Sequence, residues 1–518
     1  MYYTVFVFRR DLRIVDNTAF RECVAAVASS TTSTTIIPLF IYNHATQADP
    51  RTNPYHSSKA FAFMNQCLDD LEHAIEHLST TLSKDVRLNE RVRLLGLTRL
   101  HHRPGDGTEA DTIVNAMKRI GGVVATSRLK AVFFNRDLTP YAVHRDLELR
   151  AGLCRITHGT TEVISTEDYT LLSVEDTTVK TKAGGTYKVF GPFYANRTRM
   201  HGRISRPDPG PDVVLERQER KSTSLEGGRD FALRILERVR GGSFADYASS
   251  RDDLGRDVQG TSTTRLSAYL KFGCVSVREA YWAMHDAYGL DHALVRELFF
   301  REFYYHLTWN FPHVLRGMVR VHPNSDVEDN LNQAFSLSLS TGSSQSQSSN
   351  SRPDAYVGWK EWTEGCTGTP LVDAAMRQLE TTGFMHNRGR MVVAMYLTKD
   401  LLLDWRDGER HFATRLVDYD PVQNSAGWQW SAGVGADAAP YFRVFNPYLQ
   451  QARFDPSAEY VKRWVPELRS VDPRHVRTWE DPDVRLLYPH VNYPAPIVPS
   501  HAVAAKRAIA TFRRKRKS

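Results

Sequence analysis

Cysteine is scarce and scattered in this chain. Its 518 residues include five cysteines, at positions 23, 67, 154, 274 and 366, and no two of them form a Cys-x-x-Cys pair. This spacing argues against a disulfide framework or a zinc ribbon, and it favours a reducing compartment. We therefore expect neither structural disulfides nor a metal site.

Long apolar runs are also missing. No uninterrupted hydrophobic stretch reaches the length needed to span a membrane. The first apolar run, TVFVF, is too short for the core of a signal peptide, and Arg9 and Arg10 follow it at once. The sequence therefore predicts a soluble, intracellular protein without a membrane partner.

No charge of one sign dominates the chain. It has 67 Lys and Arg against 59 Asp and Glu, a formal net charge of +8, and 41% hydrophobic residues. These values are ordinary for a folded protein, and the length allows two or three domains with a sizeable core. The modest positive excess fits either a solubilising surface or a polyanionic partner.

The first 165 residues alternate strand and helix patterns. Strands are predicted at residues 4–8, 35–42, 129–134 and 162–165, and helices at residues 18–28, 57–78 and 110–120. All four strands read as buried. Strands that alternate with helices imply a parallel sheet with right-handed crossovers. We therefore expect a Rossmann-like α/β domain at residues 1–165.

The rest of the chain is predicted to be helical. A polar connector at residues 166–230 leads into an almost wholly helical region at residues 231–500. Residues 336–351 are rich in Ser and Gln and have no apolar face, so they predict a disordered surface loop. Residues 501–518 end in FRRKRKS, which fits a solvated tail, a nuclear-import signal or a nucleic-acid contact.

The most informative stretch runs from Phe384 to Pro447. It reads FMHNRGRM, then KDLLLDWRDGERHF, then DYDPVQNSAGWQWSAGVGADAAPYFRVFNP. Three indoles, several arginines, an Asp-x-Asp pair and isolated asparagines share one apolar framework. Indoles at intervals relay single electrons, and buried arginines and carboxylates hold a redox ring. The combination predicts cofactor-driven, one-electron chemistry rather than hydrolysis.

Two upstream segments add polar groups to helical patterns. In GTSTTRLS, residues 260–267, the hydroxyl groups precede a helical run, where they either cap the helix or bind phosphate. In RELFFREFYYHLTWNFP, residues 296–312, Glu297, Arg301 and Tyr304 fall on one helical face. Glu297 there either bonds a bound heterocycle or forms a surface ion pair with Arg301.

These motifs together resemble the photolyase/cryptochrome family. FRRDLRIVDN, residues 8–17, is similar to the opening strand and turn of the family, and TGTPLVDAAMRQLETTGFMHNRGRM and WQW…DAAPYFR…FNP are similar to its flavin domain. The resemblance covers nearly the whole chain apart from the Ser-rich insertion, part of residues 87–107 and the basic tail. MHNR and NSAGWQWSAG are most similar to class I enzymes that split cyclobutane pyrimidine dimers in DNA.

The resemblance implies a fold, cofactors, a partner and a reaction. The α/β region would be an antenna domain joined to a large all-α FAD-binding domain. A second chromophore is implied in the antenna domain, with folate, deazaflavin, flavin or none left open by the residues. The implied reaction is light-driven electron transfer from reduced FAD to a flipped-out dimer in DNA, carried out by a monomer. The alternative is a cryptochrome-like blue-light photoreceptor with little or no repair activity.

The resemblance also implies the residues that hold FAD. They are Tyr247, Thr263, Thr264, Arg265, Leu266, Ser267, Arg301, Asn387, Arg390, Asp418, Asp420 and Asn424. Arg390 and Asp418 match an ion pair against the isoalloxazine, and Asn424 matches the residue that faces flavin N5. Asp420 matches a contact at the polar edge of the ring. A charge pair at ~4 Å and an effective dielectric of ~20 is worth about 4 kcal/mol, so Arg390 would help to hold an anionic reduced flavin.

Further matches concern the substrate and the electron path. The positions that match the dimer pocket, or the grip on its phosphates, are Arg251, Glu297, Phe300, Asn387, Arg388, Met391, Trp430 and Arg443. The implied catalytic set is Glu297, Asn387, Trp405, Trp428 and Trp430. Glu297 would bond the dimer base, and Trp430 would stack on the flipped pyrimidines. Trp428 would start a photoreduction chain that continues to Trp405.

Three departures from the family pattern bear on function. Phe300 stands where a second dimer-stacking tryptophan is common, and Phe384 replaces a tryptophan beside the flavin. Arg352 stands where the third tryptophan of the electron chain is expected, so Tyr356 and Trp359 are candidate terminal donors. Enzymes that repair (6-4) photoproducts usually have histidines at the positions of Asn387 and Met391, so dimer repair is favoured.

Overall fold

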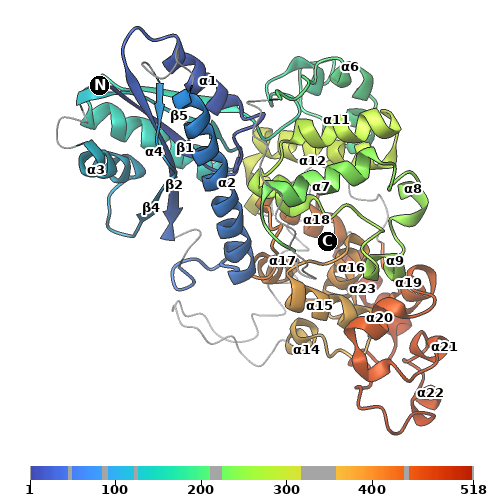
Figure 1. Ribbon diagram of the computed structural model, residues 1–518. Coiled ribbons are helices and arrows are strands. Elements are labelled where there is room, and N and C mark those ends of the chain that lie inside the picture. Colours follow the sequence, from blue (N-terminus) through green and yellow to red (C-terminus); the bar gives the residue numbers. More distant parts are fainter. Residues whose placement is uncertain are drawn as a thin grey trace. The chain divides into compact units, whose positions relative to one another are not determined.

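The computed structural model describes residues 2–44, 49–84, 92–121, 127–209, 225–316, 357–436 and 443–515. The chain forms two compact units, whose elements are labelled in Figure 1. The first comprises Met1–Tyr187, Gly191–Ser243 and Arg265–Pro312, and the second comprises Lys188–Phe190, Phe244–Thr264 and His313–Ser518. Each unit is therefore assembled from segments that lie far apart in the sequence.

The first unit combines a parallel sheet with helices. Its strands are β1 (Tyr2–Phe8), β2 (Thr34–Asn43), β3 (Val92–Leu94), β4 (Thr98–His102), β5 (Leu129–Arg136) and β6 (Glu162–Glu167). Its helices are α1 (Thr18–Ala28), α2 (Ser58–Lys84), α3 (Glu109–Gly121), α4 (Pro140–Ile156), α5 (Phe190–Tyr194), α6 (Arg197–His201), α7 (Arg229–Arg240), α10 (Ser267–Phe272), α11 (Val277–Tyr288) and α12 (Ala293–Asn310), with the 3-10 turn η3 (Thr177–Val179).

Strand β1 lies inside the sheet, whose order is β3-β2-β1-β5-β6, with β4 also paired to β2. All of these pairings are parallel. The register of β1 on β2 runs from Tyr2↔Thr34 to Phe8↔Phe40. Non-consecutive neighbours in a parallel sheet require helical crossovers, which α1 to α4 supply. The expected α/β fold of the N-terminal region is confirmed.

Alternating side chains of β1 serve two different cores. Val5 and Val7 belong to a core that also contains residues of α3 and α4. Phe6 lies on the other face, where its ring contacts Phe20 of α1 at 5.1 Å. Successive side chains of a strand point to opposite faces, so a strand covered on both faces reads as an unbroken apolar run.

The structure corrects the expectation that every strand is buried. The strand predicted at residues 162–165 forms, as β6, but most of its side chains are only half-buried because β6 lies at the edge of the sheet. The sequence did not indicate β3, β4 or α4. Strand β3 is only three residues long. Strand β4 reads TRLHH and has no buried residue. Neither strand has an apolar periodicity that distinguishes it from a loop.

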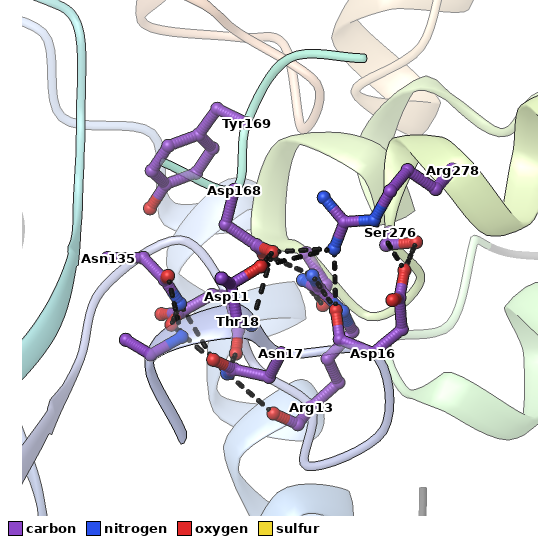
Figure 2. Close-up of polar contacts among 12 residues, drawn as sticks. Asp11, Arg13, Asp16, Asn17, Thr18, Asn135, Asp168, Tyr169, Ser276 and Arg278 are labelled. Carbon is purple, nitrogen blue, oxygen red and sulfur yellow. Dashed lines mark hydrogen bonds and ion pairs between the residues drawn. The ribbon is translucent and has the colours of Figure 1, made fainter. Parts of the chain in front are cut away.

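A buried ion network fastens the loop after β1 to helix α11 (Figure 2). Arg278 donates to Asp16 at 3.0 Å and to Asp168 at 2.7 Å. Arg13 pairs with the same Asp168. Burial alone would raise the pKa of Asp168, but the charges of Arg13 and Arg278 hold it below its usual range. Much of the FRRDLRIVDN motif therefore builds the structure around the sheet.

The second unit is helical throughout its described residues. Its helices are α8 (Tyr247–Ser250), α9 (Leu254–Val258), α14 (Trp359–Glu364), α15 (Pro370–Thr382), α16 (Asn387–Met395), α17 (Trp405–Ala413), α18 (Pro421–Ala432), α19 (Pro447–Phe454), α20 (Glu459–Trp464), α21 (Pro473–Val476), α22 (Pro482–Leu486) and α23 (His501–Lys515). Shorter turns are η4 (Pro312–Arg316), η6 (Pro466–Leu468) and the π-helical turn η5 (Tyr396–Asp400). Among the described residues, none of the helices is long and apolar enough to cross a bilayer.

The aromatic side chains of the second unit gather in one core. Trp362, Trp405, Trp428 and Trp479 are all at most 4% exposed and belong to a single apolar cluster. A buried aromatic side chain contributes more apolar area than any other type, so these rings dominate the packing of the unit. The core lies among the helices that carry the motifs between Phe384 and Pro447.

Several sequence predictions concern residues outside the described ranges or the boundaries between the predicted regions. The predicted insertion at residues 336–351 lies outside the described residues, as do Arg352, Tyr356 and tail residues 516–518. Within the predicted connector at 166–230, the structure forms α5 and α6. Helices α10 to α12 belong to the first unit, although the sequence suggested one continuous helical region from residue 231.

Candidate functional site

An ion pair joins helix α16 to the segment before α18. Arg390 donates through Nη2 to Asp418 Oδ1 and Oδ2, at 3.1 and 2.8 Å, and through Nε to the carbonyl oxygen of Met385 at 2.8 Å. The Asp418 side chain is 4% exposed and that of Arg390 is 27% exposed. The guanidinium group is thus held on one side by a buried carboxylate and is partly open on the other, as the resemblance implies for a contact with an anionic ring.

The start of helix α18 places two of the predicted cofactor residues. Asp420 is its N-cap, because Oδ1 accepts from the backbone amides of Val422 and Gln423 at 2.9 and 3.0 Å. Asn424 follows one turn later and donates through Nδ2 to Glu409 Oε1 at 3.0 Å. Capping fixes the first turn of the helix and therefore the position of Asn424.

Glu409 is a residue that the sequence did not single out. It lies on α17, and Tyr419 also donates to its Oε1, at 3.3 Å. Burial raises the pKa of Glu409 above its ordinary value, and the hydrogen bonds from Asn424 and Tyr419 only partly oppose that effect. A buried carboxyl group thus orients the amide of Asn424. Only the packing of α17 on α18 reveals this pair.

Helices α17 and α18 approach closely at a glycine. A Cβ atom at Gly408 of α17 would lie 2.2 Å from Cη2 of Trp428 of α18. Glycine in a helix interior costs about 1 kcal/mol relative to alanine, so its presence there needs a packing reason. The reason is that the indole of Trp428 lies directly against the backbone of α17. The ring also contacts Phe412 at 5.0 Å.

Trp428 and Trp430 occupy different environments, as their spacing of two residues on a helix predicts. Trp428 is 3% exposed and belongs to the aromatic core. Trp430 is half-buried, and the guanidinium of Arg443 lies 5.1 Å from the centre of its ring. A half-buried indole is partly accessible, as stacking on a base requires.

The MHNR motif organises the start of helix α16. His386 is the N-cap, with Nδ1 accepting from the amide of Arg388 at 3.1 Å and Nε2 facing the carbonyl oxygen of Arg251 at 2.9 Å. These two contacts assign the proton to Nε2. Arg388 is held by an ion pair with Asp252 at 2.5 Å and lies over the ring of Phe454 at 4.2 Å. The motif therefore brings the predicted residues Arg251 and Arg388 together.

Two further predicted residues lie on the same helix. Asn387 is exposed and Met391 is half-buried, four residues later on α16. Residues four apart on a helix are neighbours on its surface. Asn387 and Met391 are thus adjacent and accessible, as a pocket for a base requires.

The GTSTTRLS segment has buried hydroxyl groups that could bind a polar ligand. The hydroxyl oxygens of Ser262 and Thr263 are buried and have no hydrogen-bond partner among the described residues. A buried hydroxyl without a partner costs about 1–3 kcal/mol. An external acceptor, such as the phosphate or ribityl group of a nucleotide cofactor, would relieve that cost. Thr263 was predicted, and Ser262 beside it was missed.

The neighbouring cofactor residues are placed as follows. Tyr247, in α8, is buried, and the guanidinium of Arg251 lies 5.3 Å from its ring centre. Thr264 is half-buried. Helix α10, which follows the segment, is only six residues long, and Leu266 at its N-cap position makes no side-chain cap. The residue at the N-cap position thus supplies no hydroxyl cap, and of the two interpretations of this segment, phosphate binding stays a prediction.

Other predicted residues belong to the first unit. Arg265 has a positive φ of 54°, Leu266 is buried and Ser267 is exposed. On α12, Glu297, Phe300, Arg301 and Tyr304 are all half-buried and follow one another at three- and four-residue spacing. They form one accessible stripe on a helix whose other positions are largely buried.

Arg301 has partners that the sequence did not suggest. It donates to the carbonyl oxygen of Tyr169 at 2.6 Å and to Glu302 at 3.1 Å. Glu302 is deeply buried, and burial raises its pKa to about 7, although Arg301 opposes the rise. These contacts anchor α12 to the segment after β6.

Trp405 is the first residue of α17 and is 4% exposed. It shares the aromatic core with Trp428, but no ring contact joins the two residues in the described part of the chain. Its Nε1 is buried and has no hydrogen-bond partner among the described residues. The structure thus brings Trp405 near the site without placing it against Trp428.

Comparison with known proteins identifies the family of the chain. The family model of the FAD binding domain of DNA photolyase matches residues 294–514, and that of DNA photolyase matches residues 4–212. A deoxyribodipyrimidine photo-lyase of Escherichia coli is 31% identical, over 98% of this chain and 98% of its own length. The N-terminal and the C-terminal regions of the chain therefore both match photolyase family models.

Solved structures show the same likeness. An archaeal photolyase from Sulfolobus tokodaii, described with two FAD molecules, is 29% identical with a TM-score of 0.71 and covers 99% of this chain and 100% of its own. A bacterial class III photolyase from Agrobacterium tumefaciens is 28% identical with a TM-score of 0.73, covering 100% and 98%. The chain belongs to the DNA photolyase family and carries its FAD-binding domain.

Proposed function

We propose that this protein repairs cyclobutane pyrimidine dimers in DNA by light-driven electron transfer. The carrying observation is that FAD-binding and photolyase regions occur together in a chain that matches a deoxyribodipyrimidine photo-lyase along 98% of its length. Reduced FAD supplies the excited electron, which splits the dimer and then returns. The residues of the chain bind, orient and shield the reacting groups.

The flavin is held by residues of different character. Arg390, fixed by Asp418, presents a positive charge to the ring. The unpartnered hydroxyl groups of Ser262 and Thr263 donate hydrogen bonds to the phosphate or ribityl oxygens of the cofactor. Asn424 presents an uncharged amide whose nitrogen is engaged by Glu409. An uncharged group at that position tolerates a ring nitrogen with or without its proton.

The dimer is held by stacking and by arginines. Trp430 stacks on the flipped bases, and Arg443 lies against its ring. Stacking is worth ~1–3 kcal/mol per base, which is comparable to the few kcal/mol that flipping costs. Arg251 and Arg388 contact the flanking phosphates. Glu297, half-buried on α12, hydrogen-bonds the base and stabilises its radical anion.

The test is light-dependent repair. Purified protein carrying chemically reduced FAD is mixed with a dimer-containing oligonucleotide, and dimers are counted with and without blue light. We expect dimers to disappear only in the light. Retention of all dimers by protein that has bound FAD would refute repair and favour the cryptochrome-like photoreceptor.

The role of Glu297 is tested separately. Glu297→Ala is expected to lower the repair yield about tenfold or more, while DNA affinity changes much less, because the carboxyl acts on the radical anion. Equal losses in yield and affinity would show that the carboxyl only positions the substrate.

Further expectations concern antenna, assembly and location. We infer that residues 1–165 bind a second, light-harvesting chromophore, that residues 231–500 form the catalytic region, and that the protein acts as an intracellular monomer. An absorption spectrum of the purified protein separates folate, deazaflavin and flavin. Light scattering tests the monomer, and a fusion of residues 501–518 to a fluorescent protein tests nuclear import.

A further inference from the structure

Helices α16 and α18 carry accessible residues of the candidate site and are joined near their starts. The two helices pack against each other, with Asn387 and Met391 on α16 and Trp430 in the last turn of α18. The ion pair between Arg390 and Asp418 joins α16 to the segment before α18. A contact at this end alone would leave the far end of α18, which bears Trp430, free to shift. A second contact is needed to hold that end.

Lys399 supplies this second contact. It lies in the π-helical turn η5, which continues α16, and its Nζ donates to the carbonyl oxygen of Ala432, the last residue of α18, at 2.5 Å. A Cβ atom at Gly433, the C-cap of α18, would lie 4.0 Å from the same Nζ. The last carbonyl groups of a helix have no partner within that helix. Lys399 thus bonds a carbonyl group that α18 itself leaves open.

The burial of Lys399 is unusual for a lysine. Its side chain is in the core of the unit, with 3% of the residue exposed, although lysine is almost never fully buried unless it is paired. Burial lowers the pKa of its amine to about 7, so the position disfavours the charge. A buried amine that costs stability has a reason to be there when its hydrogen bond does what an apolar side chain cannot do.

The bonded end of α18 lies next to Trp430. The backbone amide of Gly433 donates to the carbonyl oxygen of Trp430 at 3.1 Å, so the C-cap closes back on the residue that is expected to stack on a base. Ala432 belongs to the same turn. A displacement of Ala432 would therefore move Trp430 relative to Asn387 and Met391 of α16.

We propose that Lys399 is a positioning residue for the damaged DNA. By holding the end of α18 against the turn that follows α16, it fixes the indole of Trp430 at the separation from α16 that a flipped dimer requires. The inference rests on the proposed function, in which Trp430 stacks on the flipped bases. Lys399 acts through Ala432 and does not touch the substrate. Its effect on the binding of damaged DNA therefore depends on the presence of Trp430.

Hydrogen exchange of the FAD-loaded protein tests the contact directly. Lys399→Met removes the donor but keeps a long, unbranched side chain that suits a buried position. The backbone amides of residues 433–435 should then exchange about tenfold faster than in the wild type, because the last turn of α18 opens more often. The amides of residues 422–424, at the start of the helix, should keep their wild-type rates. Wild-type rates at residues 433–435 in Lys399→Met would overturn the proposal.

The same turn offers a matched control. Thr398 is also buried in η5, but its Oγ1 donates to the carbonyl oxygen of Ala394, within the preceding helix, at 2.8 Å. Thr398→Val should therefore leave the exchange at both ends of α18 unchanged. Lys399→Gln keeps a shorter donor that stops short of Ala432, so it gives the same test if Lys399→Met does not fold. Faster exchange at residues 433–435 in Thr398→Val as well would show a general loosening of η5 and would overturn the specific role of Lys399.

A double-mutant cycle on DNA affinity tests the link to Trp430. Affinities for an oligonucleotide with one dimer and for the undamaged oligonucleotide are measured in the dark. Trp430→Ala should weaken binding of the damaged DNA about tenfold and Lys399→Met about fourfold, with little change for undamaged DNA. In the Trp430→Ala background, Lys399→Met should change the affinity by less than about 1.5-fold, because its target is already gone. An equal factor in both backgrounds would overturn the proposal.

The wild type separates this inference from the proposed function. Equal affinity of the wild-type protein for damaged and undamaged DNA would contradict the proposed function, and the positioning role of Lys399 with it. A wild type that prefers damaged DNA, together with a Lys399→Met variant that binds it equally well, would leave the proposed function standing and overturn the role of Lys399 alone.

Discussion

Two buried carboxyl groups, one in each unit, have pKa values that are shifted in opposite directions. In the first unit, Asp168 faces the guanidinium groups of Arg13 and Arg278, and their charges hold its pKa below the usual range although burial alone would raise it. In the second unit, Asp373 accepts hydrogen bonds from backbone amides and hydroxyl groups. Burial raises the pKa of Asp373 to about 6, because these neutral donors only partly oppose it. For these two carboxyl groups, the charge of the partners decides the direction of the pKa shift.

The same rule explains an exception within the first unit. Asp11 lies in the network around Asp168, but its donors are amides, including the side chains of Asn135 and Asn17. Burial raises the pKa of Asp11, despite those hydrogen bonds. The unit does not set the direction of the shift. Neutral donors do not offset the effect of burial on the pKa of Asp11 or Asp373, and two guanidinium groups do offset it for Asp168. The single guanidinium of Arg301 does not offset it for Glu302.

The difference has a functional side. In the second unit, burial likewise raises the pKa of Glu409, beside Asn424, and lowers the pKa of Lys399 to about 7. An interior that disfavours fixed charges screens poorly, so the partly open Arg390 acts strongly on a nearby anion. In the first unit, the charges of Arg13 and Arg278 hold loops in place, and in the second unit Arg390 and Asp418 bring charge to the candidate site.

The largest expected effect breaks the charge network of the first unit. Arg278→Met should lower the free energy of unfolding by about 3–5 kcal/mol, because it leaves Asp16 and Asp168 buried with too little positive charge. Denaturant titration measures the loss. The control is Arg21→Met at the exposed pair with Asp208, with an expected loss below about 1 kcal/mol. Equal losses in the two variants would contradict the contrast between buried and exposed pairs.

A second prediction concerns protons in the second unit. Burial lowers the pKa of His411 to about 3, with a smaller contribution from the charge of Arg415. The unfolded chain, with a histidine pKa of ~6.5, takes up a proton that the folded chain refuses, so stability falls as the pH drops below that value. The loss from His411 is at most about 2 kcal/mol between pH ~6.5 and pH ~5.

Unfolding free energies measured across this pH range test that prediction. His411→Phe should flatten the dependence on pH relative to the wild type. The raised pKa of Asp373 acts in the opposite sense, with stability rising as the pH falls, but it is common to both proteins and cancels in the difference. An unchanged slope in His411→Phe would show that the imidazole is accessible to protons in the folded state.

A smaller effect is expected at the contact between α17 and α18. Gly408→Ala forces a methyl group against Trp428, at a cost of about 1–3 kcal/mol, but alanine regains up to ~1 kcal/mol of helix propensity. We expect a net loss near 1 kcal/mol and an altered near-ultraviolet circular dichroism signal. Gly427→Ala is the control, since a Cβ there would meet no atom of the described residues within 4 Å, apart from its chain neighbours and the backbone of its own helix. That variant should gain stability, and a similar gain in Gly408→Ala would contradict the packing.

No loss of stability is expected from removing an unpartnered hydroxyl. Thr263→Val should raise the unfolding free energy of the flavin-free protein by about 1 kcal/mol or more, because the removed hydroxyl is buried and has no hydrogen-bond partner among the described residues. Its affinity for FAD should fall by about fivefold, equivalent to ~1 kcal/mol, in a flavin titration. Thr367→Val is the comparison, because its hydroxyl donates to buried Asp373 at 2.7 Å. That variant should lose stability even without flavin.

Much of the molecule was readable from local pattern. Apolar runs and helical periodicity located β1, β2, β5, α1 and α2, because a strand or a helix buries its residues at a regular spacing. The spacing of Trp428 and Trp430 correctly separated a buried ring from a half-buried one. The long motifs between Phe384 and Pro447 carried the resemblance to the family.

The edge strands and several contacts of the site were not readable in this way. Strand β4 has no buried residue, so no periodicity marks it, and its place depends on pairing with β2. Likewise, the bond between Asn424 and Glu409 joins two helices. Nothing in the sequence between them states which faces will meet.

The sequence by itself determined the alternation of β1, β2, β5 and β6 with α1, α2 and α3, the helical character of the second unit and the resemblance to the family. These follow from hydrophobic spacing and from contiguous motifs, both of which are local. Only the tertiary structure decided that Glu409 holds Asn424, that Gly408 makes room for Trp428, and that Lys399 bonds the last carbonyl group of α18. Those contacts depend on how helices pack, and packing is set by the shapes of side chains that the chain brings together from distant positions.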